Sequence, residues 1–348
     1  MARTRVAAPR SEVSEPSTAD RFDALLTALE PSAERMALAA QLPRLIRDEI
    51  AHSARLRTVE PHTLLVGSYR RHTATGDIKD VDIAILVTRD YASAAPQVVL
   101  DDLAFVLNDA RRRKHLRNIE RRAQRRSIRC QLIDDDFQID LVPVVAAASD
   151  PYGDLWIPDR EQRHWLPTRS IGYVEELAKL NSTSGGKLVR LIKLLKYWKD
   201  QKGIDRFQAK SFWIEALVVE LVREGKIAWT GGWAEVTARA FRALYQRCLP
   251  VYNSGAGIPI VPDPMIASSN VAHNWKRDGF EAFFGKLSAS QKAAQAALAL
   301  EETASVEKWR IVFGHGFAPR WTDDLPTAAT WGGALVGGAW LLRYLLKR

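Results

Sequence analysis

The sequence contains very little cysteine, since Cys130 and Cys248 are the only two among 348 residues. That excludes a disulfide framework and argues against a zinc site built from cysteines. No apolar stretch follows the polar N-terminal residues, so no secretory signal is expected. No segment repeats at a fixed period, which argues against a solenoid. These absences favour a protein of the reducing cytoplasm.

The length is sufficient for two lobes, each with its own core. We expect a flexible tail at 1–20, a lobe of mixed sheet and helices at 21–150, a mainly helical lobe at 151–319, and a linker with an apolar tail at 320–348. All 11 tryptophans and the longest stretches of helical periodicity follow residue 151. These tryptophans are expected in the core rather than on a base-stacking surface. The fold class is therefore predicted to be α+β.

The first lobe combines helical and strand patterns. Residues 21–53 are helical in periodicity and are interrupted by prolines at 31 and 43, which predicts two or three helices. Strands are expected at 63–66, 81–87, 127–133 and 137–142, with a hairpin turn at 134–136. A further helix is expected from about residue 98 into the segment that follows.

That segment, residues 111–129, carries ten Lys or Arg and one acid, so its own charge equals the net charge of +9 of the whole chain. A basic helix here would attract phosphates, and an activating RNA or a regulatory protein is a candidate partner. The alternative is a solvated, arginine-rich helix face.

Two aspartates, Asp80 and Asp82, begin the apolar strand 81–87. Residues i and i+2 of a strand point to the same face, so these carboxylates would lie side by side and repel each other unless a cation joins them. Asp140, within "FQIDLVPVV", could reach them from a neighbouring strand. Three such carboxylates can hold two Mg²⁺ ions, with Mn²⁺ as a substitute. The alternative is a set of acids on a solvent-facing strand.

Gly67 and Ser68 directly follow the first strand. Glycine lets the backbone approach a phosphate, and the serine hydroxyl and exposed amides donate hydrogen bonds to it. With the three aspartates, this pair favours a phosphate site over a simple turn.

These elements resemble the nucleotidyltransferase core of the DNA-polymerase-β superfamily. The later segments "KLLKYWK", "KSFWIE", "IVPDPMIASSNVA" and "WRIVFGHGF" resemble the bacterial CD-NTases within it, over about residues 22–317. CD-NTases are related to cyclic GMP-AMP synthase and oligoadenylate synthetase, and they make cyclic nucleotide signals in anti-phage defence. The resemblance implies a polymerase-β-like lobe with a helical lobe that completes the nucleotide cleft.

The resemblance also implies roles for individual residues. Asp80 and Asp82 would ligate both metals, Asp140 one of them, and Ser68 with Gly67 would hold the donor triphosphate. Lys196 and Ser211 match residues that grip the β- and γ-phosphates, with Lys193 as an alternative to Lys196. Asp263 matches a residue near the donor base. Without the resemblance, Lys196 reads as a snorkelling helix lysine and Ser211 as a helix cap.

The implied activity is Mg-dependent joining of ATP and other NTPs into a cyclic di- or trinucleotide, with release of pyrophosphate. Linear oligonucleotide synthesis, nucleotide addition to RNA ends and a non-enzymatic nucleic-acid scaffold remain as alternatives. No cysteine and histidine cluster like the zinc element of the animal DNA sensor is present, and the C-terminus is not the small-residue type used for conjugation.

The C-terminal tail is apolar. Residues 328–346 carry one charge, Arg343, over a length that barely spans a bilayer. A docked terminal helix or an oligomer contact is favoured over a membrane anchor.

Overall fold

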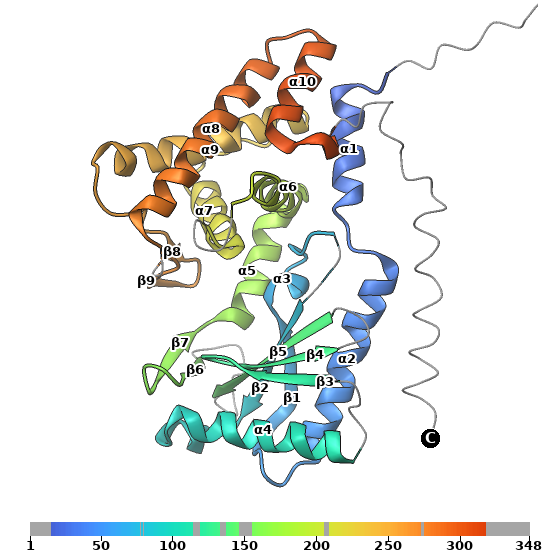
Figure 1. The fold of residues 1–348 in the computed structure, drawn as a ribbon, viewed down its shortest axis with the longest axis vertical. Coiled ribbons are helices and arrows are strands. Elements are labelled where there is room, and N and C mark those ends of the chain that lie inside the picture. Colours follow the sequence, from blue (N-terminus) through green and yellow to red (C-terminus); the bar gives the residue numbers. More distant parts are fainter. Residues whose placement is uncertain are drawn as a thin grey trace, which may run out of the picture.

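The computed structural model describes residues 15–76, 78, 80–113, 119–132, 137–145, 155–204, 209–272 and 275–317. Figure 1 shows them as two lobes, one built on a sheet and the other made mostly of helices. This arrangement confirms the α+β fold class predicted from the sequence.

A seven-stranded mixed sheet forms the base of the first lobe. Five strands lie in the order β1-β2-β5-β4-β3, and β6 and β7 continue from β5. Strands β2 and β5 run parallel, whereas β1 is antiparallel to β2 and β4 is antiparallel to β5. The strands are β1 Thr58–Val66, β2 Asp80–Val87, β3 Ile119–Ala123, β4 Ile128–Leu132, β5 Phe137–Val145, β6 Leu155–Asp159 and β7 His164–Thr168. The four predicted strands are confirmed, while residues 134–136 of the predicted turn lie outside the described residues.

Helices α2 (Ala33–Ala51) and α4 (Pro96–Arg112) pack on this sheet. The odd-numbered apolar residues of β2, from Val81 to Val87, are buried in the core that these helices share with the sheet. Ala84 and Leu86 contribute to a smaller core on the opposite face. This alternation is the one expected of a strand buried on both sides. Short helices α3 (Gly67–Arg70) and η1 (Arg89–Ser93) follow β1 and β2.

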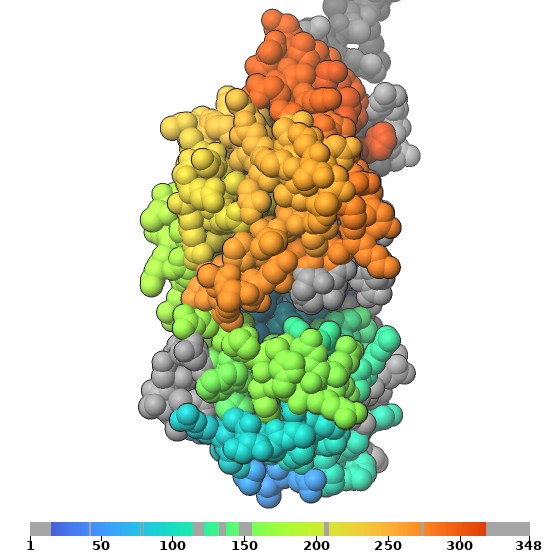
Figure 2. Space-filling view, turned by 90° about the vertical axis from the view of Figure 1, so that its left-hand side faces the viewer, coloured from blue at the N-terminus to red at the C-terminus, as the bar shows by residue number. Residues whose placement is uncertain are grey.

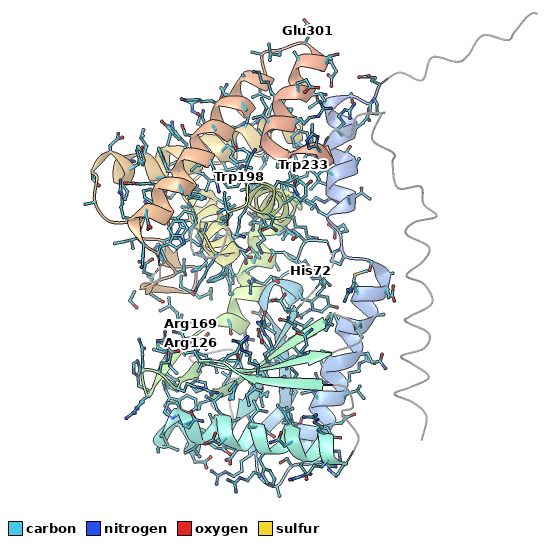
Figure 3. All side chains as sticks on the ribbon, viewed as in Figure 1. His72, Arg126, Arg169, Trp198, Trp233 and Glu301 are labelled. Atoms are coloured by element: carbon cyan, nitrogen blue, oxygen red, sulfur yellow. The ribbon has the colours of Figure 1, made fainter. Side chains whose placement is uncertain are left out.

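The second lobe is a bundle with an aromatic core. Its helices are α1 Thr18–Ala28, α5 Ser170–Thr183, α6 Lys187–Gln201, α7 Ser211–Arg223, α8 Trp233–Asn253, α9 Arg277–Ala297 and α10 Glu302–Phe313, with the hairpin β8 Pro262–Asp263 and β9 Ile266–Asn270, and η2 His315–Phe317. Trp198, Trp213 and Trp309 are fully buried, which confirms the predicted core role for these three. Trp198 lies in the middle of the bundle in Figure 3.

The two cores divide the chain differently from the predicted boundaries at residues 20 and 150. Helix α1 belongs to the helical core, where the Phe22 ring lies edge-on to Trp309 at 4.9 Å and to Phe317 at 5.0 Å. Strands β6 and β7 belong to the sheet because they extend it from β5. Within its described residues the chain therefore crosses between the lobes twice, between α1 and α2 and between β7 and α5.

Pro43 does not interrupt the helix that contains it. α2 begins after Ser32, whose hydroxyl accepts from the Arg35 amide, and continues through Pro43. The predicted break at this proline is wrong, whereas the break near Pro31 is present. Burial of Ala39, Ile46 and Ile50 stabilises the helix and offsets the hydrogen bond that proline cannot make.

The prediction of a basic helix at 111–129 is wrong. Helix α4 ends at Arg112, and the described residues after 118 form the antiparallel hairpin β3–β4, with Arg122 opposite Arg129. Pairing of β4 with β5 buries Ile128 and Cys130 and overrides the helical preference of the arginines. Arg125 and Arg126, in the turn, donate to the buried Asp159 carboxylate at the end of β6. Several of the basic side chains therefore hold the fold together.

Replacing Asp159 by asparagine is expected to lower the free energy of unfolding by about 3 kcal/mol at neutral pH. Burial raises the pKa of Asp159, but hydrogen bonds from Arg125, Gln162 and Arg126 lower it by more than burial raises it. The pKa of Asp159 is therefore lowered overall. A carboxyl group with a lowered pKa stabilises the folded state at pH values above its ordinary pKa near 3.8. This stabilisation is lost as the pH falls below that value. Urea unfolding of both proteins from pH 7 to pH 3 measures this effect, since the difference between their unfolding free energies should shrink below about pH 4.

Glu161→Gln, at an exposed partner of Arg125, provides the control and should change the unfolding free energy by less than about 0.5 kcal/mol. A difference between Asp159→Asn and the parent that is constant over this range would contradict the assignment.

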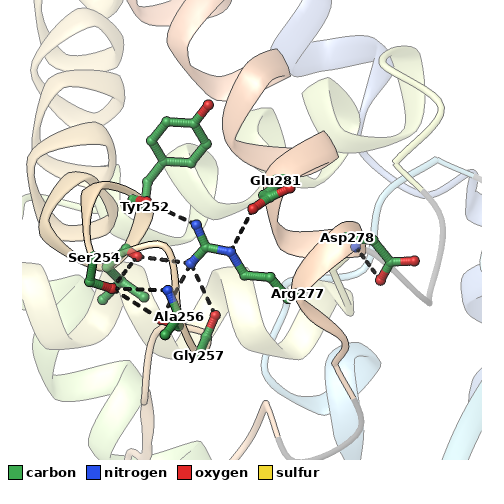
Figure 4. Close-up of polar contacts among 9 residues, drawn as sticks. Tyr252, Ser254, Ala256, Gly257, Arg277, Asp278 and Glu281 are labelled. Carbon is green, nitrogen blue, oxygen red and sulfur yellow. Dashed lines mark hydrogen bonds and ion pairs between the residues drawn. The ribbon is translucent and has the colours of Figure 1, made fainter.

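One arginine closes the end of α8 (Figure 4). The Arg277 guanidinium donates to the carbonyls of Val251 and Tyr252, at 2.9 and 2.8 Å, and to those of Ala256 and Gly257 in the following turn. Its Nε donates to Glu281 at 2.7 Å. The last carbonyls of a helix lack partners within the helix, so this cation satisfies them and opposes the helix dipole.

Arg277→Met is expected to cost about 2 kcal/mol of unfolding free energy, because several carbonyls lose a charged donor together. Thermal and urea unfolding measure the loss. The neighbouring exposed Lys276 provides the control, since Lys276→Met should stay within about 0.5 kcal/mol of the parent. Equal losses in the two variants would show that the carbonyl contacts contribute little.

The structure contains no helix with the length and apolar character needed to cross a membrane among its described residues. The apolar tail at 328–346 lies outside those residues.

Candidate active site at the junction of the lobes

The Gly-Ser pair lies where β1 ends and α3 begins, beside the aspartates of β2. Gly67 has a φ of +71°, and a Cβ placed there would lie 1.8 Å from Oδ2 of Asp82. Glycine is therefore required both by the backbone conformation and by the close approach of the carboxylate. The turn that follows is closed by the Thr73 amide, which donates to the Ser68 carbonyl at 2.9 Å.

The three predicted carboxylates lie on adjacent strands. Asp82 is directly opposite Asp140 in the parallel register of β2 and β5, and Asp80 is two residues away. Burial, followed by the charges of Asp80 and Asp140, raises the pKa of Asp82 to about 6. Burial and the Asp140 charge also raise the pKa of Asp80. Acidic oxygens that repel each other in this way suit a hard divalent cation.

Asp140 has a protein partner that the sequence analysis missed. Arg129, directly opposite on β4, donates to both of its carboxylate oxygens, at 2.8 and 2.6 Å. Within the described part of the chain, no three histidine, cysteine, aspartate or glutamate side chains are arranged as a ready metal site. The charge of Asp140 is therefore paired within the protein by Arg129.

A cavity of about 230 Å³ brings residues from both lobes together. Its lining includes Ser68 and Asp80 from the sheet lobe and Lys196 and Ser211 from α6 and α7. Figure 2 shows the surface hollowed at the junction of the lobes, below the orange hairpin β8–β9. Four of the residues singled out from the sequence therefore share one cavity.

The other two second-lobe candidates lie elsewhere. Lys193 pairs with Glu30 at 2.7 Å and is not among the lining residues of this cavity. Asp263 lines a second cavity of about 370 Å³ between α7 and the hairpin β8–β9, and its carboxylate accepts from the Met265 amide. The structure does not bring Asp263 together with the carboxylates of β2.

The sequence analysis also missed Glu215, whose side chain on α7 is completely buried. Its carboxylate accepts from Arg71 Nε at 2.6 Å, Thr73 Oγ1 at 2.9 Å and Lys196 Nζ at 2.7 Å. The attraction of Lys196 and Arg71 outweighs burial and lowers the pKa of Glu215 to about 2. An acid within the apolar run "SFWIEALVV" was the available signal, since a buried carboxylate needs cationic partners.

Comparisons with known proteins agree with this geometry. Residues 17–181 match the family model described as Second Messenger Oligonucleotide or Dinucleotide Synthetase domain. A cyclic AMP-AMP-AMP synthase of an Acinetobacter species is 29% identical over 337 residues, which cover 93% of this chain and 92% of that protein.

Solved structures share the fold. CdnC of E. coli MS115-1, in a complex with HORMA-deltaN, has a TM-score of 0.68 and 20% identity, covering 86% of this chain and 97% of that one. The CD-NTase CdnG of Bradyrhizobium diazoefficiens, in complex with GTP, has a TM-score of 0.64 and 15% identity, covering 87% and 96%. The chain is thus similar over residues 17–181 to a synthetase domain and over nearly its whole length to a cyclic AMP-AMP-AMP synthase, and it shares its fold with solved CD-NTases.

Proposed function

We propose that this protein joins ribonucleoside triphosphates into a cyclic oligonucleotide that serves as a second messenger in anti-phage defence. The cavity at the lobe junction, where Ser68 and Asp80 meet Lys196 and Ser211, carries the proposal. Similarity over nearly the whole length to a cyclic AMP-AMP-AMP synthase favours ATP as the substrate and a cyclic trinucleotide of adenylate as the product.

The residues of this chain divide the work of the reaction. Ser68 and the Gly67 backbone hold the donor triphosphate, while Lys196 and Ser211 grip its β- and γ-phosphates. The acceptor hydroxyl attacks the donor α-phosphorus in line, and pyrophosphate leaves. By the resemblance, Asp263 would lie near the donor base; in the structure it lines a separate cavity between α7 and the hairpin β8–β9.

Asp80, Asp82 and Asp140 would hold two Mg²⁺ ions, with Mn²⁺ as a substitute. When bound, the ions activate the acceptor hydroxyl and stabilise the leaving phosphate oxygen. The fit rests on the raised pKa values of Asp80 and Asp82 and on the close approach of Gly67 to the Asp82 carboxylate. Asp140 also accepts from Arg129, so its oxygens would be shared between that guanidinium and an ion.

Incubation with all four NTPs and Mg²⁺ or Mn²⁺, followed by mass spectrometry, tests the proposal. The expected product contains three adenylate units and resists phosphatase, because a ring has no terminal phosphate. A phosphatase-sensitive ladder would instead indicate linear synthesis. No product, together with RNA binding that Asp80→Ala, Asp82→Ala leaves unchanged, would indicate a nucleic-acid scaffold.

A regulatory partner at the basic residues remains part of the proposal. The CdnC neighbour was solved with a HORMA protein, which favours a protein partner over RNA. Where the basic stretch is described, its exposed members are Arg122 on β3 and Arg111 to Arg113 at the end of α4. We place the protein in the cytoplasm, with the apolar tail as an oligomer or membrane contact.

A further inference from the structure

A buried ionic cluster joins the two lobes behind the proposed triphosphate cavity. Glu215 and Lys196 come from the helical lobe, whereas Arg71 and Thr73 belong to the turn that follows the Gly-Ser pair. Figure 3 shows His72, between those two turn residues, at the junction of the lobes. One carboxylate therefore holds the phosphate loop of the sheet lobe against α6 and α7.

Lys196 makes three contacts within this cluster. Its ammonium donates to Glu215 at 2.7 Å and to the carbonyl and hydroxyl of Thr73, both at 3.0 Å. An ammonium has three donors, so all of them are engaged by the protein. Lys196 reaches a phosphate only by exchanging one of these contacts, and Glu215 determines where the ammonium lies when the donor arrives.

The charges of the cluster depend on Glu215. Arg71 lies over the rings of Tyr173 and Phe212, at 5.1 and 5.5 Å from their centroids, and it has little access to water. Loss of the Glu215 charge would leave Arg71 and Lys196 as two buried cations without an anion. Such a pair is unfavourable, so Lys196 would lose its proton or the loop would move away.

We propose that Glu215 is a positioning residue for the donor triphosphate, an inference that rests on the proposed function. It does not line the cavity itself. By holding Arg71, Thr73 and Lys196 together, it fixes the loop beside Ser68 and the Lys196 charge in one geometry. Glu215 should therefore strengthen binding of the phosphates and leave binding of the nucleoside unchanged.

The test compares Glu215→Gln with the parent in binding a non-hydrolysable ATP analogue and, by competition, adenosine. We expect the analogue to bind about tenfold more weakly or worse, because a charged hydrogen-bond network is lost. Adenosine affinity should stay within about twofold of the parent. Equal losses for the two ligands, or no loss for the analogue, would overturn the proposal.

Asp102→Asn provides a matched control. Asp102 is also a buried carboxylate that accepts from an arginine, Arg55, and from a hydroxyl, that of Tyr91, but it lies within the sheet lobe. Its replacement should lower the melting temperature and leave analogue binding unchanged. Weakening like that of Glu215→Gln would show that affinity only follows stability, against the proposal.

If Glu215→Gln does not fold, Arg71→Lys gives the same test, since Arg71 does not line the cavity and the change removes its Nε contact with Glu215 while keeping the positive charge. It should weaken the analogue about threefold or more and spare adenosine, and unchanged analogue binding would overturn the proposal. Measurements on the parent protein test the proposed activity separately from the role of Glu215. A parent that binds the analogue and forms no product contradicts the activity, while the variants still test Glu215.

Discussion

Replacing Asp80 and Asp82 together by asparagine is expected to reduce product formation by at least about 10³-fold, because several kcal/mol of metal-dependent stabilisation would be lost. The same change should leave the melting temperature unchanged or raise it by about 2 °C. A carboxyl whose pKa is raised in the folded state destabilises that state as the pH rises from 3.8 through about 6. At pH 7 the parent therefore carries a cost that asparagine removes.

Mass spectrometry of the product and thermal unfolding with and without Mg²⁺ measure these effects. The ion should raise the melting temperature of the parent, since it binds the folded state, and leave that of the variant unchanged. Asp101→Asn, at an exposed acid on α4, should match the parent in every measurement. Retained synthesis in the double variant would place the chemistry elsewhere.

Gly67→Ala should have the second largest effect, a loss of about 10²-fold in product formation. An alanine Cβ would overlap the Asp82 carboxylate, so that carboxylate or the loop carrying Ser68 must move. The backbone conformation adds about 1 kcal/mol of strain, because left-handed φ values disfavour a Cβ.

Gly76 provides the comparison, since its φ is +56° and nothing lies within 4 Å of an added Cβ. Gly76→Ala should lose about as much stability from backbone strain as Gly67→Ala does, and it should keep its activity. Initial rates and urea unfolding of both variants separate the clash from the strain. Equal activities would show that contact between Gly67 and Asp82 is not needed for synthesis.

Local patterns predicted the part of the site that lies on β1 and β2. Alternation along 81–87 placed Asp80 and Asp82 on one face. The position of Gly67 after a strand indicated a close approach to a phosphate, but its approach to the Asp82 carboxylate was not predicted. Resemblance supplied Lys196 and Ser211, which the cavity brings together with Ser68.

Other features depend on contacts between distant segments. Composition alone does not decide between helix and strand for the arginines of 111–129, because pairing of β4 with β5 decides it. The partners of Glu215 come from residues more than 140 positions earlier and from the preceding helix, so no spacing rule links them. Arg129 beside Asp140 likewise follows from strand register.

The two crossings between the lobes determine how the lobes can move. One passes between α1 and α2 and the other between β7 and α5 (Figure 1). Two bodies tethered at two separate points keep one easy degree of freedom, a rotation about the line through both tethers. The Glu215 contacts link the lobes at a further place, so a rotation about residues 29–32 and 169 would have to break them.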